Sequence, residues 1–191
     1  VTCPINKKTI QSSEFNFNGH TDYLCHKFGL DDVLMFMVSD VMKVGLVTDH
    51  LPLAKVPENI SQELILSKLR LMKDTLIKDF GIRKPQIGVL GLNPHAGDDG
   101  LLGEEEQSVI APAVKAARDQ EEILAFGPFP GDGYFGSGHY QKFDATLAMY
   151  HDQGLAPFKA LTFGAGVNYT AGLPMVRTSP DHGPAYSLAG P

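Results

Sequence analysis

Lys43-Val-Gly-Leu-Val-Thr48 opens the part of the sequence that decides the fold class. It is followed by a helical pattern from Ser61 to about Phe80 and then by the run Pro85-Gln-Ile-Gly-Val-Leu-Gly91. The first and last segments are apolar runs rich in residues that favour strands. Between them, Ser61 is a good N-cap, Gly81 is a helix stop, and apolar residues recur at helical spacing at Leu64, Leu69, Met72, Leu76 and Ile77. A strand, a helix and a second strand in this order predict an α/β fold with a largely parallel sheet.

Further elements extend this pattern on both sides. Val33-Leu-Met-Phe-Met-Val38 is separated from the first run by the turn signal Ser39-Asp40, so the two runs are predicted to form a strand pair. Periodicity predicts a second helix at residues 103–119 and further strands at residues 123–126 and 145–149. The Gly- and Pro-rich sequence from Gly154 onward predicts loops.

Composition and charge restrict the class of protein. The 191 residues are enough for one good core or two small lobes, and 43% hydrophobic and 20% charged residues are ordinary for a globular protein. The net charge of −6 and the lack of a basic run argue against a nucleic-acid partner. No apolar stretch reaches the roughly 18 residues that a membrane span needs. Cys3 and Cys25 form no disulfide framework and no CxxC site, and with no visible signal peptide we expect a cytoplasmic location.

Three histidines lie in similar local settings, each after a hydrophobic run and before a tight turn. They are His50 in Thr48-Asp-His-Leu-Pro52, His95 in Asn93-Pro-His-Ala-Gly97 and His151 in Tyr150-His-Asp-Gln-Gly154. The carboxyl ends of strands in an α/β sheet point into the ligand crevice, so three imidazoles there are candidate ligands of one metal ion. A lone histidine in a core strand is more often a structural residue, but three equivalent positions favour a shared site. Convergence depends on the fold, because no HExxH spacing enforces it.

The loop Asn93-Pro-His-Ala-Gly-Asp-Asp-Gly100 precedes the second predicted helix, a position that suggests phosphate binding. Three glutamates argue against a phosphate there, since Glu104, Glu105 and Glu106 occupy the positive end of that helix. We therefore expect phosphate to be held elsewhere, by Lys7, Lys159 or Arg177. The sequence contains no GxGxxG fingerprint and no nucleophile elbow, which argues against a Rossmann site and against covalent serine hydrolysis.

These candidate residues lie within longer motifs that run the length of the chain. In order they are Val1-Thr-Cys-Pro-Ile-Asn-Lys7, Gly19-His-Thr21, Thr48-Asp-His-Leu-Pro-Leu53, Gly91-Leu-Asn-Pro-His-Ala-Gly97, Ala148-Met-Tyr-His-Asp-Gln-Gly154 and Arg177-Thr-Ser-Pro-Asp-His-Gly183. The series resembles the 4-hydroxythreonine-4-phosphate dehydrogenase family of vitamin B6 biosynthesis. Because the family's usual N-terminal portion and closing helices are missing, we expect residues 1–191 to be a fragment of one two-lobed catalytic unit.

The resemblance implies the two-lobed α/β/α fold of the isocitrate and isopropylmalate dehydrogenases, incomplete in this chain. It assigns sheet and helices to roughly residues 1–150 and substrate and nucleotide loops to residues 151–191. The tail from His182 is similar to the nucleotide loop of that group of enzymes. The resemblance therefore makes His182, Gly183 and Ala185 candidate cofactor-binding residues, with NAD or NADP as the cofactor.

The resemblance also implies a set of site residues. A divalent metal, whether zinc, magnesium, cobalt or manganese, is expected on His50, His95 and His151. Contacts to a phosphorylated substrate are expected from His20, Thr21, Lys159, Asn168 and Arg177. The implied partner is a second copy of the chain, in a homodimer whose active site is built between subunits.

The reaction implied by the resemblance is metal-dependent, NAD(P)-linked oxidation and decarboxylation of 4-hydroxy-L-threonine 4-phosphate to 3-amino-2-oxopropyl phosphate, in pyridoxal phosphate synthesis. Asp152 and Asp132 are the candidate general bases, with a partner that orients His151 and a turn residue as their respective alternatives. Three competing functions stay open: a dehydrogenase for phosphothreonate or phosphoerythronate, metal-dependent hydrolysis of a phosphate ester, and ligand binding without turnover.

Overall fold

The computed structural model describes residues 1–6, 9–12, 15–17 and 19–182 of the chain. Its strands are β1 (Leu34–Val38), β2 (Lys43–Leu46), β3 (Gln86–Leu90), β4 (Leu124–Phe129), β5 (Ala145–Ala148), β6 (Val167–Ala171) and β7 (Thr178–Pro180). Its α-helices are α1 (His20–Phe28), α2 (Val56–Asn59), α3 (Gln62–Lys78), α4 (Ala111–Glu121), α5 (Gly131–Gly136) and α6 (His151–Thr162). Short helical turns are η1 (Leu53–Lys55), η2 (Pro94–Gly100), η3 (Glu106–Ile110) and η4 (His139–Lys142).

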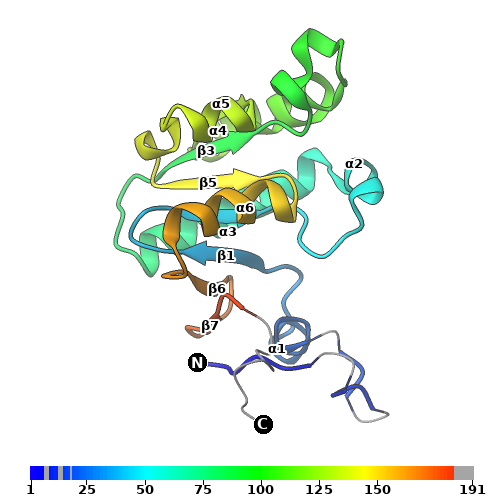
Figure 1. Cartoon of the computed structure of the whole chain (residues 1–191), viewed down its shortest axis with the longest axis vertical. Coiled ribbons are helices and arrows are strands. Elements are labelled where there is room, and N and C mark those ends of the chain that lie inside the picture. Colours follow the sequence, from blue (N-terminus) through cyan, green and yellow to red (C-terminus); the bar gives the residue numbers. More distant parts are fainter. Residues whose placement is uncertain (7–8, 13–14, 18, 183–191) are drawn as a thin grey trace.

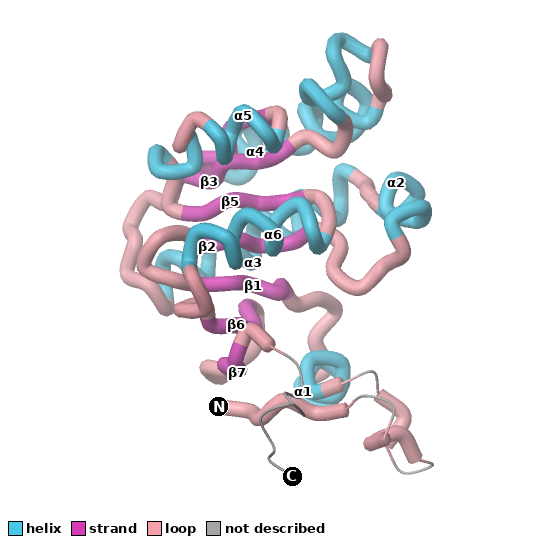
Figure 2. The backbone as a smooth tube through the Cα atoms, viewed as in Figure 1, coloured by secondary structure: helices cyan, strands magenta, loops and turns pink. Residues whose placement is uncertain are grey.

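The described strands form one mixed sheet in the order β4-β3-β5-β2-β1-β6-β7 (Figure 2). The four strands from β4 to β2 are parallel to their neighbours, as predicted. Strand β1 pairs antiparallel with β2, which confirms the predicted strand pair of residues 33–38 and 43–48. Strands β6 and β7 continue the sheet antiparallel, so the prediction of a largely parallel sheet is wrong for this half. A tight turn reverses the chain between β1 and β2, because the Ser39 hydroxyl accepts the backbone N–H groups of Val41 and Met42.

Helices cover both faces of the sheet, with α3 and α4 on one side and α5 and α6 on the other (Figure 1). Successive side chains of a strand point to opposite faces, so Phe36 of β1 lies in one core and Met37 lies in the other. The first core includes Ile65, Leu69, Val89 and Leu147. The second core includes Val44, Leu46, Leu155 and Phe158. The predicted α/β class and its α/β/α layering are therefore confirmed for the described residues.

Helix α3 shows how far the sequence pattern predicts a buried face. The Leu64 backbone N–H donates to the Ser61 side chain at 3.1 Å, which confirms the predicted N-cap. Leu69, Met72 and Leu76 are fully buried as predicted, and Ile65 is buried beside them. Ile77 is instead 37% exposed, since Thr75 and Leu76 are the buried positions in the last turn of the helix.

The prediction of loops after Gly154 is wrong, since this sequence forms α6, β6 and β7. Gly154 lies on the face of α6 that packs on the sheet, where a Cβ atom would lie 2.7 Å from Val44 and 2.9 Å from Leu46. The glycine is therefore needed for close packing of the helix and is not a loop signal. Pro157 is accommodated inside α6. The strand β6 then pairs along its whole length with β1.

No helix in the described part of the chain is both long and apolar enough to span a membrane. The cytoplasmic location and the expected absence of a nucleic-acid partner stay predictions. The division into lobes near residue 150 also stays a prediction, although the described residues on both sides of it contribute strands to the same sheet.

Candidate functional site

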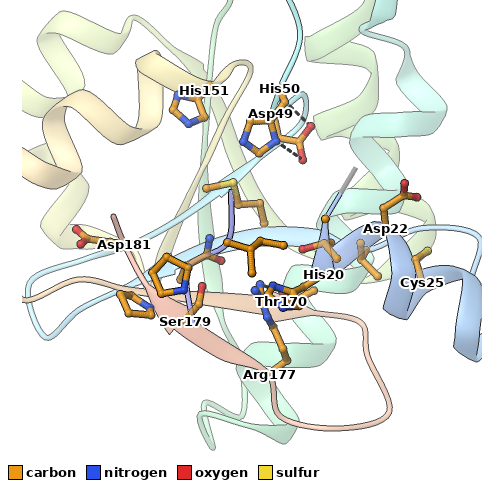
Figure 3. Close-up of a pocket in the computed structure, with 18 of the residues that line it drawn as sticks. His20, Asp22, Cys25, Asp49, His50, His151, Thr170, Arg177, Ser179 and Asp181 are labelled. Atoms are coloured by element: carbon orange, nitrogen blue, oxygen red, sulfur yellow. Dashed lines mark hydrogen bonds and ion pairs between the residues drawn. The ribbon is translucent and has the colours of Figure 1, made fainter. Parts of the chain in front are cut away.

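A cavity of about 850 Å³ lies at the end of the sheet where β2 and β5 finish, between α6 on one side and α1 with the N-terminal segment on the other (Figure 3). Most of the predicted metal and substrate residues line it, namely His20, Thr21, His50, His151, Lys159, Asn168 and Arg177. They come from α1, from the turns after β2 and β5, from α6, from β6 and from the segment before β7. The fold therefore gathers residues that are far apart in the sequence around one cavity.

His50 and His151 approach each other because they follow adjacent parallel strands. Leu46 of β2 pairs with Ala148 of β5, and the two histidine rings lie 5.7 Å apart between their centroids. With metal–nitrogen bonds of about 2.0–2.1 Å, two rings on one tetrahedral ion have centres roughly 5 Å apart. The separation of the two rings is therefore close to that of two imidazoles on one ion.

Two aspartates stand directly beside these imidazoles. The Nδ1 atom of His151 lies 2.7 Å from Oδ1 of Asp152, a contact that orients the ring and leaves its other nitrogen available. Asp49 contacts His50 in the same way at 3.5 Å and also accepts the His50 backbone N–H at 2.6 Å. Hydrogen bonding to the His50 side chain holds the pKa of Asp49 well below its usual range. A charged Asp49 therefore supports a positive charge at this end of the cavity.

A polar wall of the cavity is built around Arg177, which is buried. Its guanidinium donates to the Thr170 hydroxyl at 3.0 Å and to the Thr2 hydroxyl at 2.7 Å. Burial, and then the positive charge of Arg177, lower the pKa of His20. His20 is therefore a neutral hydrogen-bonding group near pH 7, beside a fixed cation. Lys159 is exposed and donates to the Asp181 carbonyl at 3.1 Å.

His95 does not line this cavity. It is exposed in η2, which follows β3, and its backbone is left-handed with φ of 54°. No group of three or more His, Cys, Asp or Glu side chains in the described part of the chain is close enough to hold a metal ion. The structure thus brings two of the three predicted metal ligands together within one chain, and the shared site of all three stays a prediction.

Three further predictions concern residues at the edge of this site or beyond it. His182 lines the cavity, whereas Lys7, Gly183 and Ala185 lie outside the described residues. Asp132 is exposed in the first turn of α5 and does not line the cavity. Its role as a base therefore stays a prediction without geometric support, whereas Asp152 contacts a residue that lines the cavity.

Two residues that the sequence analysis did not select fasten the histidine turns to one another. The Thr48 hydroxyl donates to the Met149 carbonyl at 2.7 Å and so ties the His50 turn to the His151 turn. The Gln153 side chain accepts the Met149 N–H at 2.7 Å and donates to the Gly91 carbonyl at 2.6 Å, which ties α6 to the end of β3. The sequence holds no spacing signal for either residue, because each side chain bonds a backbone atom of another segment.

We expect Gln153→Met to lower the free energy of unfolding by about 1–3 kcal/mol, because it leaves the Met149 N–H and the Gly91 carbonyl without their partners. The methionine preserves the length of the side chain, so the loss reports the hydrogen bonds more than the packing. Urea denaturation measures the change, with Gln120→Met, at an exposed position of α4, as the control. An equal stability of the two variants would contradict the fastening role of Gln153.

Comparison with known proteins covers the whole chain. The family profile described as "Pyridoxal phosphate biosynthetic protein PdxA" matches residues 1–191. The 4-hydroxythreonine-4-phosphate dehydrogenase of Bacteroides thetaiotaomicron is 55% identical over 191 residues, which are 100% of this chain and 52% of that protein. The enzyme of the same name from Sulfurihydrogenibium sp. is 48% identical over 190 residues, 100% of this chain and 58% of that protein. The chain thus spans about half the length of the curated relatives it matches.

Solved structures show the same fold. The 4-hydroxythreonine-4-phosphate dehydrogenase from Klebsiella pneumoniae superposes with a TM-score of 0.85 at 38% identity, over 97% of this chain and 55% of that chain. A terephthalate 1,2-cis-dihydrodioldehydrogenase from Burkholderia xenovorans LB400 superposes with a TM-score of 0.78 at 26% identity, over 98% of this chain and 59% of that chain. Because proteins with different names share the fold, the profile and the sequence identities decide the family. The chain belongs to the PdxA family of pyridoxal phosphate biosynthetic proteins.

Proposed function

We propose that the protein is a 4-hydroxythreonine-4-phosphate dehydrogenase, which oxidises and decarboxylates 4-hydroxy-L-threonine 4-phosphate to 3-amino-2-oxopropyl phosphate with NAD or NADP as the hydride acceptor. The names of its relatives support this assignment. The observation that carries it is the cavity near α6, whose lining includes a histidine pair and the cationic side chains of Lys159 and Arg177. Such a cavity offers separate places for a metal ion and for a substrate phosphate.

The phosphate of the substrate is proposed to bind Lys159 and Arg177, which both line the cavity. Both side chains carry a positive charge, and a guanidinium and an ammonium are the groups that proteins use most for phosphate. His20 and Thr21, at the start of α1, supply neutral donors and acceptors beside them. Asn168 of β6 adds an amide that can bond the amino or carboxylate group of the substrate.

His50 and His151 are proposed to hold a divalent metal, with His95 of a second subunit as the third ligand. The separation of the first two rings supports the pair, and the position of His95 away from them supports a site shared in a homodimer. A bound zinc, cobalt, manganese or magnesium ion supplies Lewis-acid chemistry that eases ionisation of a hydroxyl group. The Asp152 carboxylate contacts the His151 ring, so we propose that it acts as the base or holds that ring in a ligating orientation, whereas Asp132 does not line the cavity.

The assignment is tested by incubating the purified full-length gene product with NAD, a divalent metal and 4-hydroxy-L-threonine 4-phosphate. We expect reduced nicotinamide and carbon dioxide to form in equal amounts. Phosphothreonate and phosphoerythronate, tested in parallel, are expected to be turned over more slowly. Release of inorganic phosphate without nicotinamide reduction would instead show a phosphate-ester hydrolase, and binding without either product would show a protein that is not catalytic.

Metal removal gives a separate prediction. Dialysis against a chelator is expected to abolish nicotinamide reduction, because neutral imidazoles alone supply no Lewis acid. Activity is expected to return when cobalt or zinc is added back, and the metal content before and after dialysis is measured by atomic absorption. Full activity in the metal-free protein would contradict the proposed role of His50 and His151.

A further inference from the structure

We propose that Glu106 is a positioning residue, whose buried carboxylate holds the left-handed turn that carries His95 and thereby sets the affinity of the metal site. This inference rests on the proposed function for the role of His95. The sequence predicts Glu106 only as a charge at a helix end. Its contacts in the structure are of a different kind.

Glu106 is 3% exposed, and its carboxylate contacts the loop after β3. Its Oε1 atom accepts the backbone N–H groups of Leu92 and Asn93, both at 2.7 Å. Its Oε2 atom accepts the side-chain amide of Asn93 at 3.0 Å. A buried carboxylate is costly unless such donors stabilise it, and these three all come from the segment that leads into His95.

Glycines make room for this carboxylate. A Cβ atom on Gly91 would lie 2.9 Å from Oε1 of Glu106, and one on Gly97 would lie 2.7 Å from Oε2. These two glycines are placed before and after His95, so the loop bearing the imidazole wraps around the carboxylate. Glu105 extends the arrangement, since its carboxylate accepts the Asn93 side-chain amide at 2.7 Å.

The turn held in this way is strained. His95, Ala96, Asp98 and Asp99 have φ between 44° and 54°, and Gly97 among them is also left-handed. A non-glycine residue in this conformation costs roughly 1–2 kcal/mol, so a run of four does not persist without support from its surroundings. The hydrogen bonds to Glu106 supply that support at the entry to the run. Glu106 also begins η3, a π-helical turn, a rare geometry that often accompanies functional sites.

Substitution of Glu106 in the full-length gene product tests the proposal, with Co²⁺ as the probe of the metal site. Glu106→Ala removes every acceptor, whereas Glu106→Gln keeps one carbonyl oxygen for the Leu92 and Asn93 N–H groups. Glu104→Ala, at an exposed position just before, is the matched control. We expect Glu106→Ala to weaken Co²⁺ binding about 10- to 100-fold, the usual effect of losing a group that orients a metal ligand. Glu106→Gln is expected to recover most of the affinity.

A double-mutant cycle with His95→Ala separates positioning from general destabilisation. If Glu106 acts through His95, then Glu106→Ala has no further effect on Co²⁺ affinity once His95 is absent. An equal loss of affinity in both backgrounds, or wild-type affinity in Glu106→Ala, would overturn the inference.

Hydrogen exchange decides the structural half of the inference independently of the metal. The backbone amides of Leu92 and Asn93 are expected to exchange faster in Glu106→Ala and at the wild-type rate in Glu104→Ala. Unchanged exchange at these amides would overturn the inference whatever the metal result. If the wild-type protein binds no Co²⁺ while these amides respond as expected, the proposed function fails, and so does the part of the inference that concerns metal affinity.

Discussion

Replacing His151 with alanine is expected to abolish metal binding and turnover. The ring is one of two imidazoles whose centroids lie 5.7 Å apart in the cavity, so its loss leaves a single ligand from that pair. Loss of a group that merely orients a ligand costs about 10- to 100-fold in metal affinity, and loss of the ligand itself is expected to exceed that range. Co²⁺ titration and nicotinamide reduction measure the two effects.

A histidine of the same chain outside the cavity provides the control. His26 is exposed on α1 and does not line the cavity, so His26→Ala is expected to keep both metal and activity. The double variant His50→Ala/His95→Ala removes one proposed ligand from the cavity and one from the left-handed turn. Retention of bound metal by this double variant would falsify the shared site.

Gly154→Val is expected to give the largest loss of stability among substitutions on α6. Its Cβ atom would lie 2.7 Å from Val44 and 2.9 Å from Leu46, both on the buried face of β2. Relief of that overlap requires α6 to move away from the sheet or these buried side chains to leave their packed positions, at a cost of about 1–3 kcal/mol or more. The helix begins at His151 and carries Lys159, so turnover is expected to fall along with stability.

The matched control is a helical glycine with open space around it. Gly136, at the end of α5, has no neighbouring atom within 4 Å of an added Cβ. Gly136→Ala is expected to leave stability unchanged or to raise it by up to about 1 kcal/mol, because alanine favours a helix. Urea denaturation of both variants measures the difference. Similar midpoints for Gly154→Val and wild type would contradict the close packing of α6.

Local sequence patterns predict most of the elements of this fold, because capping and periodicity act within a few residues. Ser61 and the strand runs before and after α3 illustrate this. The turn between β1 and β2 is a local signal, and the pair was predicted from it. The antiparallel pairing of β6 with β1 joins distant segments, so it was not predictable from local pattern. Gly154 and Pro157 misled the prediction for the same reason, since tertiary packing overrides the preference of these residues for loops.

The candidate site also combines features that local sequence predicts with features that depend on contacts between distant segments. The sequence motifs contain many of the residues that line the cavity. They occur in the order expected for a family that matches the whole sequence. The side chains that hold those residues in place are harder to identify from the sequence. Gln153 and Glu106 act through backbone atoms of other segments, and no spacing in the sequence reports such contacts. The separation of His95 from His50 likewise depends on which way a left-handed turn faces.

The pairing of β1 has a consequence for how the chain folds during synthesis. One edge of β1 meets β2 a few residues later, but its other edge meets β6, where Phe36 pairs with Tyr169 near the end of the described sequence. A nascent chain that has been synthesised only as far as β5 therefore exposes the free edge of β1, a strand with apolar residues on both faces. Unpaired edges of this kind recruit other chains, so the growing protein is most prone to aggregate in the interval before β6 emerges.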